Sequence, residues 1–186
     1  MAVRLMRVIA GQYRGLRIRA PRGPGTRPAT GRVRESVFSA LGSVVVGARV
    51  LDLYAGSGSF GIESLSRGGR SALFVERSRP ALAALRSNLQ FMGIGDRAEV
   101  AATTVERFVT RGEEWRRFDI VFADPPWDIS SETLAGILVL VSRWMNPDAV
   151  AIVTRRAGDD APAVSGMEVA DQRRHGDAEV IRYSRE

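Results

Sequence analysis

One stretch decides the fold of this chain, residues 50–61, which read VLDLYAGSGSFG. An apolar run stops at the acidic Asp52, a glycine-rich turn follows, and a helical pattern begins after the turn. This order is typical of a strand, a tight loop and a helix N-terminus, where open α/β sheets hold nucleotide-like ligands. Gly56 and Gly58 would let the backbone turn sharply and approach such a ligand closely.

This turn has three interpretations. It could bind a dinucleotide, it could bind S-adenosylmethionine, or it could be a plain glycine turn beside two surface acids. The spacing Gly56-x-Gly58-x-x-Gly61 matches the dinucleotide fingerprint, which also expects an acid about 20 residues further on, where Glu76 stands. Asp52 argues against a dinucleotide, because its carboxylate would face a pyrophosphate of like charge. S-adenosylmethionine carries a cationic amino group and a sulfonium, which an acid favours. Glu76 could accept hydrogen bonds from both of its ribose hydroxyls.

Composition restricts the chemistry. The 186 residues, 45% of them hydrophobic, are enough for one domain with a full core. There is no cysteine or lysine and a single histidine, so all 27 basic residues are arginines. This excludes a disulfide framework, a cysteine-ligated zinc site, Schiff-base lysine chemistry and a P-loop lysine, and we expect no metal. No apolar signal core or membrane-spanning run is visible, so we expect a cytoplasmic protein. We also expect the protein to be a monomer.

Charge is concentrated at the N-terminal end. Residues 1–34 contain nine arginines and no acid, whereas the remaining 152 residues hold 18 arginines and 21 acids, a net charge of −3. The formal net charge of +6 therefore comes from the first segment. Such a block suggests a polyanionic partner, in preference to a merely solvated arginine-rich surface.

The N-terminal segment predicts its own small structure. Residues 7–19 contain two short β-like runs around glycines, which we interpret as a basic hairpin. Residues 20–31 are rich in proline and glycine and predict a loop. A helix should follow, with an apolar face formed by Val33, Val37, Phe38 and Leu41. We expect residues 1–30 to form a basic hairpin and loop, and residues 31–186 to form the main domain.

From residue 49 onward, strand and helix patterns alternate. Strands are expected to end at Asp52 and Glu76, and to cover about 98–102, 118–123 and 149–153; helices should follow the first four. Two late strands, near 167–172 and 179–183, could pair as a hairpin. This alternation predicts an α/β fold with a doubly wound, mostly parallel sheet and right-handed crossovers. Its strand ends carry Asp52, Glu76, the pair Thr103-Thr104, and Asp124, which should share the ligand-binding edge.

The tetrapeptide Asp124-Pro125-Pro126-Trp127 is the most specific signal. Two prolines after a buried strand make a rigid turn. The carboxylate and a nearby carbonyl could both accept hydrogen bonds from one –NH₂ group, favouring a pyramidal nitrogen and stabilising its developing positive charge. Trp127 offers a flat face for stacking a base. This pattern indicates methylation of a base amine; the alternative is a proline-fixed loop with a core tryptophan.

The target base can be narrowed by its hydrogen-bonding edge. Guanine presents two adjacent donors, N1–H and the N2 amine, and one carboxylate can accept from both. Adenine presents an acceptor at N1, which the Asp124 carboxylate would repel. Aspartate at this position therefore suits guanine better than adenine.

These motifs together resemble the class I methyltransferases, and a narrower group within them. Residues 27–35, RPATGRVRE, with 7–11, RVIAG, and 13–15, YRG, are similar to the bacterial small-subunit (16S) ribosomal RNA guanine-N2 methyltransferases. The resemblance covers essentially the whole chain. It implies a Rossmann-like seven-stranded sheet, S-adenosylmethionine as donor, and a guanine in ribosomal RNA or the small ribosomal subunit as acceptor.

The resemblance and the strand-end arguments give three sets of site residues. Catalysis is assigned to Asp124, Pro125, Pro126 and Trp127. Cofactor binding is assigned to Asp52, Tyr54, Ala55, Gly56, Ser57, Gly58, Glu76, Arg77, Thr103 and Thr104. RNA binding is assigned to Arg7, Arg14, Arg17, Arg19, Arg27, Arg32 and Arg34. Thr104 stands where the family commonly has an adenine-binding Asp; its oxygen can accept the same hydrogen bond, without the charge.

Three other functions stay open at this point. One keeps the cofactor and changes the target to DNA adenine or a protein amide. Another is a non-catalytic nucleic-acid-binding module. The last is an NAD-dependent dehydrogenase, which the glycine spacing alone would allow.

Overall fold

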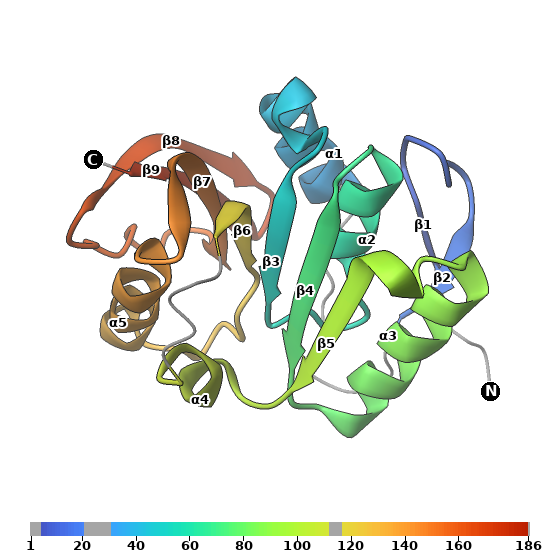
Figure 1. Cartoon of the computed structure of the whole chain (residues 1–186). Helices are drawn as coiled ribbons and strands as arrows, with labels where there is room; N and C mark the ends of the chain where they lie inside the picture. The colour runs from blue at the N-terminus through green and yellow to red at the C-terminus, as the bar shows by residue number, and fades with distance from the viewer. Residues whose placement is uncertain (1–4, 21–30, 112–116, 186) are drawn as a thin grey trace.

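The computed structural model describes residues 5–20, 31–111 and 117–185 (Figure 1). Within these residues, seven strands form one twisted sheet. In spatial order they are β5 (Ala98–Ala102), β4 (Ser71–Glu76), β3 (Arg49–Leu53), β6 (Phe118–Ala123), β7 (Met145–Arg156), β9 (Ala178–Arg185) and β8 (Met167–His175).

The sheet is parallel except at one end. Strands β5, β4, β3, β6 and β7 all pair in parallel, and β9 pairs antiparallel with both β7 and β8. The predicted doubly wound, mostly parallel, seven-stranded sheet with a C-terminal antiparallel hairpin is therefore confirmed. The chain reverses its winding direction between β3 and β6, and ligands bind open α/β sheets at the carboxyl ends of such strands.

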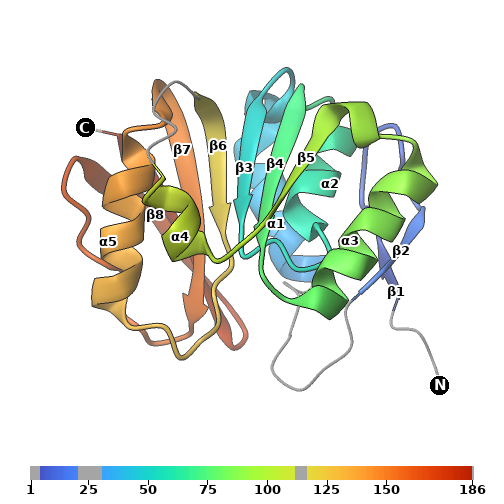
Figure 2. The ribbon, with the colours of Figure 1, turned by 60° about the horizontal axis from the view of Figure 1, so that its bottom comes forward.

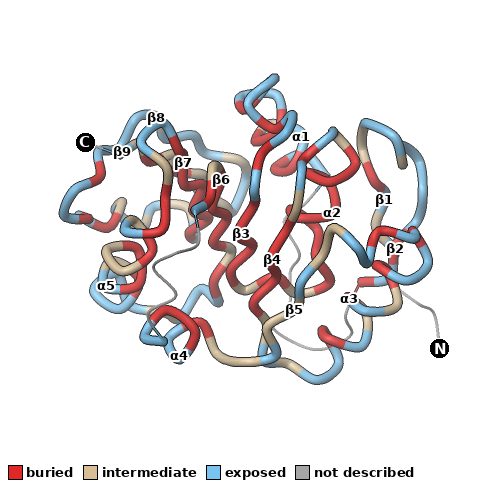
Figure 3. Tube along the Cα trace, in the orientation of Figure 1, coloured by how far each residue is buried: buried red, intermediate tan, exposed pale blue. Residues whose placement is uncertain are grey.

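Helices cover both faces of the sheet (Figures 1 and 2). One face carries α1 (Gly31–Leu41), α2 (Ser59–Ser66) and α3 (Arg79–Met92), and the other carries α4 (Val105–Val109) and α5 (Ser131–Ser142). Short 3₁₀ turns, η1 (Gly42–Val45) and η2 (Gly95–Arg97), precede β3 and β5. Because both faces are covered, the central strands are buried along their length (Figure 3) and read as continuous apolar runs in the sequence.

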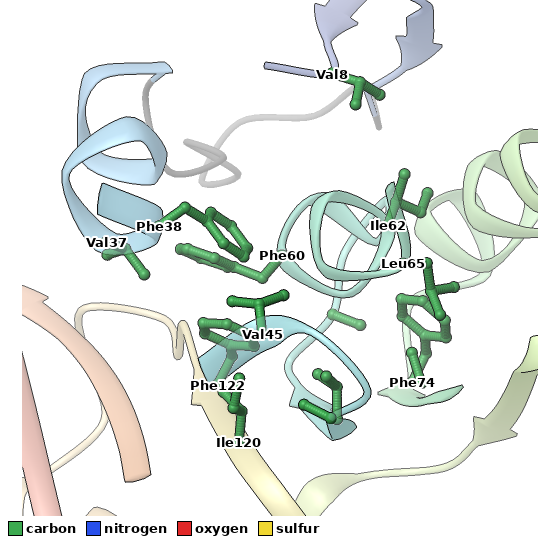
Figure 4. Packing of buried hydrophobic residues seen from close by; sticks show 14 of the residues in the cluster. Val8, Val37, Phe38, Val45, Phe60, Ile62, Leu65, Phe74, Ile120 and Phe122 are labelled. Atoms are coloured by element: carbon green, nitrogen blue, oxygen red, sulfur yellow. The ribbon is translucent and has the colours of Figure 1, made fainter. Parts of the chain in front are cut away.

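Each face has its own apolar core. On the α1–α3 side, the rings of Phe60 and Phe122 stack with centroids 4.8 Å apart, and Phe38 lies 5.7 Å from Phe122 (Figure 4). The predicted apolar face of α1 is buried in this core. On the other side, Phe108 of α4 meets Trp144 edge-on, with centroids 5.5 Å apart. Strand β7 begins earlier than predicted: Met145 pairs with Phe118 at the start of β6, and the register shifts before Val150 pairs with Ile120.

The N-terminal segment forms the predicted basic hairpin. Strands β1 (Leu5–Arg7) and β2 (Arg17–Arg19) pair antiparallel as a separate ribbon beside α3 (Figure 2). Ile18 points into the core, while the flanking Arg17 and Arg19 are exposed. The proposed division of the chain at residue 30 stays a prediction, since residues 21–30 lie outside the described part.

A buried carboxylate fastens this ribbon to the sheet domain. Glu63, in α2, has no solvent exposure, and its two oxygens accept the backbone N–H groups of Ile9 at 2.8 Å and Ala10 at 3.0 Å. Arg67 Nε donates to the same carboxylate at 2.8 Å. Arg34 completes the cluster, with Nη1 3.7 Å from Glu63 and Nη2 donating to the carbonyl of Arg7.

Arg34 is therefore a correction to the predicted RNA-binding set. Its side chain is buried, with 2% of its surface exposed, so the guanidinium cannot meet a phosphate at the surface. Burial lowers the pKa of Arg34, and the nearby Glu63 charge acts in the opposite direction. Arg34, in the first turn of α1, pairs with the Glu63 carboxylate, which holds the ribbon.

Replacing Glu63 should strongly destabilise the protein. We expect Glu63→Ala to lower the free energy of unfolding by about 3–5 kcal/mol, because it leaves a buried guanidinium and two backbone amides without their acceptor. The measurement is urea unfolding followed by circular dichroism. Glu35→Ala, on the exposed side of α1, is the matched control and should change the stability by less than about 0.5 kcal/mol. Equal effects of the two changes would contradict the anchoring role.

Candidate active site

A cavity of about 870 Å³ opens at the carboxyl ends of the parallel strands. Its volume is in the range that holds cofactor-sized ligands. Eleven residues predicted for the cofactor and catalytic sets line it together: Tyr54, Ala55, Gly56, Ser57, Glu76, Arg77, Thr103, Asp124, Pro125, Pro126 and Trp127. The strand ends therefore meet at one edge, as the alternation of strands and helices predicts.

Asp52 is present in the site but does not line the cavity. Its side chain is 1% exposed, and Oδ2 accepts the N–H of Gly61, in the first turn of α2, at 2.9 Å. Burial raises the pKa of Asp52 well above its usual range; the Gly61 hydrogen bond lowers it, and the charges of Asp124 and Glu76 raise it further. The predicted direct contact of Asp52 with a cationic cofactor stays a prediction. In the structure, Asp52 ties the strand to the helix that follows the turn.

Glu76 is held by three backbone amides. Oε2 accepts the N–H of Gly56 at 2.8 Å, and Oε1 accepts those of Arg77 at 2.8 Å and Ser78 at 2.7 Å. Because a carboxylate has about four acceptor positions, these bonds leave one on Oε2. Glu76 can therefore still accept a ligand hydroxyl, and it also fixes the distance between the glycine-rich turn and β4.

The turn itself depends on left-handed backbone conformations. Gly56 has φ of +58°, and Tyr54 adopts +56°, which is rare for a residue with a side chain and occurs at functional sites. Gly58, at +86°, does not line the cavity: a Cβ there would lie 2.6 Å from Leu85. Gly58 thus permits close packing of α2 against α3, and its predicted cofactor contact stays a prediction.

Tyr54 contributes a polar atom that lacks a protein partner. Among the described residues, no hydrogen-bond partner lies near its buried hydroxyl oxygen. Burial raises the pKa of Tyr54 above its usual range, Glu106 raises it further, and Arg77 lowers it. Tyr54 lines the cavity, and its buried hydroxyl is a polar group whose capacity for hydrogen bonding is unused within the described residues.

The two threonines after β5 differ in their roles. Thr103 lines the cavity. Thr104 does not; its Oγ1 accepts the N–H of Arg107 at 3.2 Å and so caps the N-terminus of α4. The predicted adenine contact of Thr104 stays a prediction, and the cap is a role that the sequence interpretation did not assign to it. Glu106, in the first turn of the same helix, lines the cavity and is a carboxylate that the sequence interpretation missed.

The Asp124 turn is braced by β7. The hydroxyl of Thr154 donates to Asp124 Oδ1, which fixes the orientation of the carboxylate. The next residue, Arg155, is buried, and its Nη1 donates to the carbonyl of Ile129 at 2.9 Å while Nη2 pairs with Asp159 at 3.2 Å. Both residues were missed, although Thr154 directly follows the apolar run of a strand that neighbours β6.

Trp127 is at the cavity wall and not in the core. Its side chain is 37% exposed, and the guanidinium carbon of Arg156 lies 5.6 Å from its ring centroid. The fully buried tryptophan of this region is Trp144. The alternative of a loop with a core tryptophan therefore does not describe this turn.

Other lining residues were missed because they flank the motifs. They are Ser59, Val75, Ser78, Ala81, Val105, Asp128 and Ile129. Each lies within a few residues of a predicted strand end, so a wider window around those ends would have included them. The exposed arginines Arg7, Arg14, Arg17, Arg19 and Arg32 stay candidates for RNA binding, and Arg27 lies outside the described residues. No described helix has the length and apolar character needed to cross a membrane.

Known proteins share this chain's sequence and fold. The putative rRNA methyltransferase YlbH of Bacillus subtilis is 37% identical over 140 residues, 75% of each chain. Ribosomal RNA small subunit methyltransferase D of Escherichia coli is 34% identical over 86% of this chain and 79% of its own. The solved structure of the putative methyltransferase yhhF from Escherichia coli superposes with a TM-score of 0.83 at 31% identity, covering 98% of each chain.

These relatives confirm the resemblance found in the sequence. The sequence profile of the family described as Conserved hypothetical protein 95 matches residues 6–184, nearly the whole chain. The chain belongs to this family, whose relatives named above include methyltransferases of small-subunit ribosomal RNA.

Proposed function

We propose that this protein transfers a methyl group from S-adenosylmethionine to the exocyclic N2 amine of a guanine in small-subunit ribosomal RNA. One observation carries the proposal: Asp124, oriented by Thr154 on a rigid Pro-Pro-Trp turn, lines the same cavity as Glu76 and the glycine-rich turn. An amine-orienting carboxylate and a ribose-binding carboxylate thus share one site. The names of the relatives support ribosomal RNA as the substrate class.

The cavity residues fit S-adenosylmethionine. Glu76 keeps one acceptor position for a ribose hydroxyl, and the Tyr54 hydroxyl has no protein partner among the described residues. Glu76 and Asp124 concentrate negative charge around the turn, which favours a cationic ligand over a pyrophosphate. When bound, S-adenosylmethionine supplies an electrophilic methyl group on a sulfonium.

The chain's own contribution is to orient and polarise the amine. The Asp124 carboxylate accepts hydrogen bonds from guanine N1–H and from one N2–H, and Trp127 stacks on the base. As the nitrogen forms its bond to the methyl carbon, the carbon–sulfur bond breaks and positive charge develops on nitrogen. The same carboxylate stabilises that charge before the nitrogen releases a proton. Thr154 keeps Asp124 aligned throughout.

Methyl transfer with identification of the product tests the proposal. Purified protein is incubated with methyl-labelled S-adenosylmethionine and either naked small-subunit RNA or small subunits from cells that lack the enzyme. The RNA is then digested to nucleosides. Labelled N2-methylguanosine is the expected product. Labelled adenosine, or label on protein or DNA, would point to one of the alternative targets; a protein that binds RNA without any transfer would be a binding module.

Asp124 should control the rate of transfer more than cofactor affinity. We expect Asp124→Ala to slow single-turnover transfer by roughly 10²–10³-fold, by analogy with the loss of one preorganised electrostatic group. Asp124→Asn should be intermediate, because its amide oxygen still accepts one hydrogen bond while its NH₂ opposes guanine's second donor. S-adenosylmethionine affinity, measured by calorimetry, should change far less. A folded Asp124→Ala variant with the wild-type rate would rule out this mechanism.

Glu76 should control cofactor affinity. Glu76→Ala should weaken S-adenosylmethionine binding by about 1–3 kcal/mol, the scale of lost hydrogen bonds to a charged group. The loss includes the disordering of the turn, because the Gly56 amide loses its acceptor. Calorimetric titration measures the effect, and Glu35→Ala is the control with unchanged affinity. Wild-type affinity in Glu76→Ala would exclude the ribose assignment.

The ribbon arginines should set the salt dependence of RNA binding. Arg17→Gln combined with Arg19→Gln should flatten the slope of log affinity against log salt by about 1 for each phosphate that the protein no longer neutralises. Filter binding at several salt concentrations measures the slope. Arg49→Gln combined with Arg70→Gln removes two exposed arginines at the amino ends of β3 and β4, opposite the cavity, and is the matched control. An equal change in both proteins would show that the effect reflects only total charge.

A further inference from the structure

One buried side chain joins the N-terminal ribbon to the glycine-rich turn. Asn88 lies on the inner face of α3 and is 2% exposed. Its Oδ1 accepts the N–H of Arg19 at 2.8 Å, and its Nδ2 donates to the carbonyls of Arg19 at 2.9 Å and Ser57 at 3.1 Å. Arg19 ends β2, and Ser57 lines the cavity.

The geometry leaves this amide little freedom. Both of its N–H groups and its oxygen are engaged, so a rotation that keeps one hydrogen bond breaks the others. On the ribbon side, the Asn88 amide forms hydrogen bonds with the backbone N–H and the backbone carbonyl of Arg19, as a paired strand would. Toward the cavity, it holds the carbonyl of a residue in the glycine-rich turn. Asn88 therefore connects the backbone of β2 with the backbone of the glycine-rich turn.

We propose that Asn88 is a positioning residue through which RNA on the N-terminal ribbon and S-adenosylmethionine on the glycine-rich turn strengthen each other's binding. The inference rests on the proposed function, because it takes these two ligands as given. RNA held by the exposed Arg17 and Arg19 side chains restrains β2 and, through Asn88, the carbonyl of Ser57. The second ligand then meets a turn that is already ordered, which lowers the entropic cost of binding. Such coupling is reciprocal between the two ligands.

Ser66 provides a matched control, because it anchors the ribbon at another place. Its Oγ accepts the N–H of Tyr13 at 3.1 Å and donates to the carbonyl of Ala10. It stands at the C-terminal end of α2, whereas the turn precedes the N-terminal end of this helix. Ser66→Ala should therefore loosen the ribbon without removing the link to Ser57.

The test measures one ratio, which is the affinity for S-adenosylhomocysteine in the presence of small ribosomal subunits divided by the affinity in their absence. Binding of labelled S-adenosylhomocysteine, which cannot transfer a methyl group, is followed by equilibrium dialysis with and without saturating small ribosomal subunits from cells lacking the enzyme. In the wild type, the subunits should tighten binding at least about fivefold, the lower end of typical coupling between sites. Asn88→Ala should bring the ratio close to 1. Ser66→Ala should bind subunits more weakly and keep the wild-type ratio.

A second variant separates positioning from folding. Asn88→Asp keeps an acceptor for the N–H of Arg19 and loses the donor to the carbonyl of Ser57. It should therefore also bring the ratio of affinities close to 1. Circular dichroism and thermal unfolding show which variants are folded. A merely structural loss would weaken both affinities and leave the ratio unchanged. If either folded Asn88 variant keeps the wild-type ratio, Asn88 does not couple the sites.

The outcomes also separate this inference from the proposed function. A wild-type ratio of 1 in an enzyme that binds subunits and methylates their RNA would overturn the coupling alone. Failure of the wild type to bind subunits or to transfer methyl groups would overturn the proposed function, and the inference with it.

Discussion

Two carboxylates hold the glycine-rich turn, and the site depends on them. Asp52 accepts the Gly61 amide from one side of the turn, and Glu76 accepts the Gly56 amide from the other. These bonds join β3, α2 and β4 at the point where the sheet reverses its winding. Four backbone amides accepted by two carboxyl groups hold a short segment with several left-handed residues in one conformation. The cavity wall exists because this segment is fixed.

The same arrangement gathers negative charge where a cation would sit. Asp52, Glu76 and Asp124 come from three neighbouring strands, and the charges of the other two help to raise the pKa of Asp52. Parallel strands produce this concentration, since all their carboxyl ends meet at one edge. The net excess of positive charge comes from residues 1–34, which include the ribbon. The molecule therefore separates an arginine-rich ribbon from a cavity that carries carboxylates on its wall.

Local patterns predicted the fold and the identity of the strand ends, because apolar periodicity and glycine or proline turns act over a few residues. The direction of single side chains could not be predicted in this way. Arg34 looks like a surface arginine in the sequence, and only the burial of Glu63, 29 positions away, explains why it is inside. Thr104 caps a helix, a role that its position after a strand does not indicate. Thr154 and Asn88 act through partners 30 or more residues distant, which no local window contains.

The order of the last strands affects how the protein tolerates shortening. Strand β9 follows β8 in the chain, yet it lies between β7 and β8 in the sheet. A proteolytic cut or stop codon before residue 178 would remove β9 and leave β8 without the strand it pairs with. It would also uncover the edge of β7, whose unpaired backbone groups could then recruit strands from other molecules. Such a truncation would spare every residue that lines the cavity and still convert the protein into an aggregation-prone one.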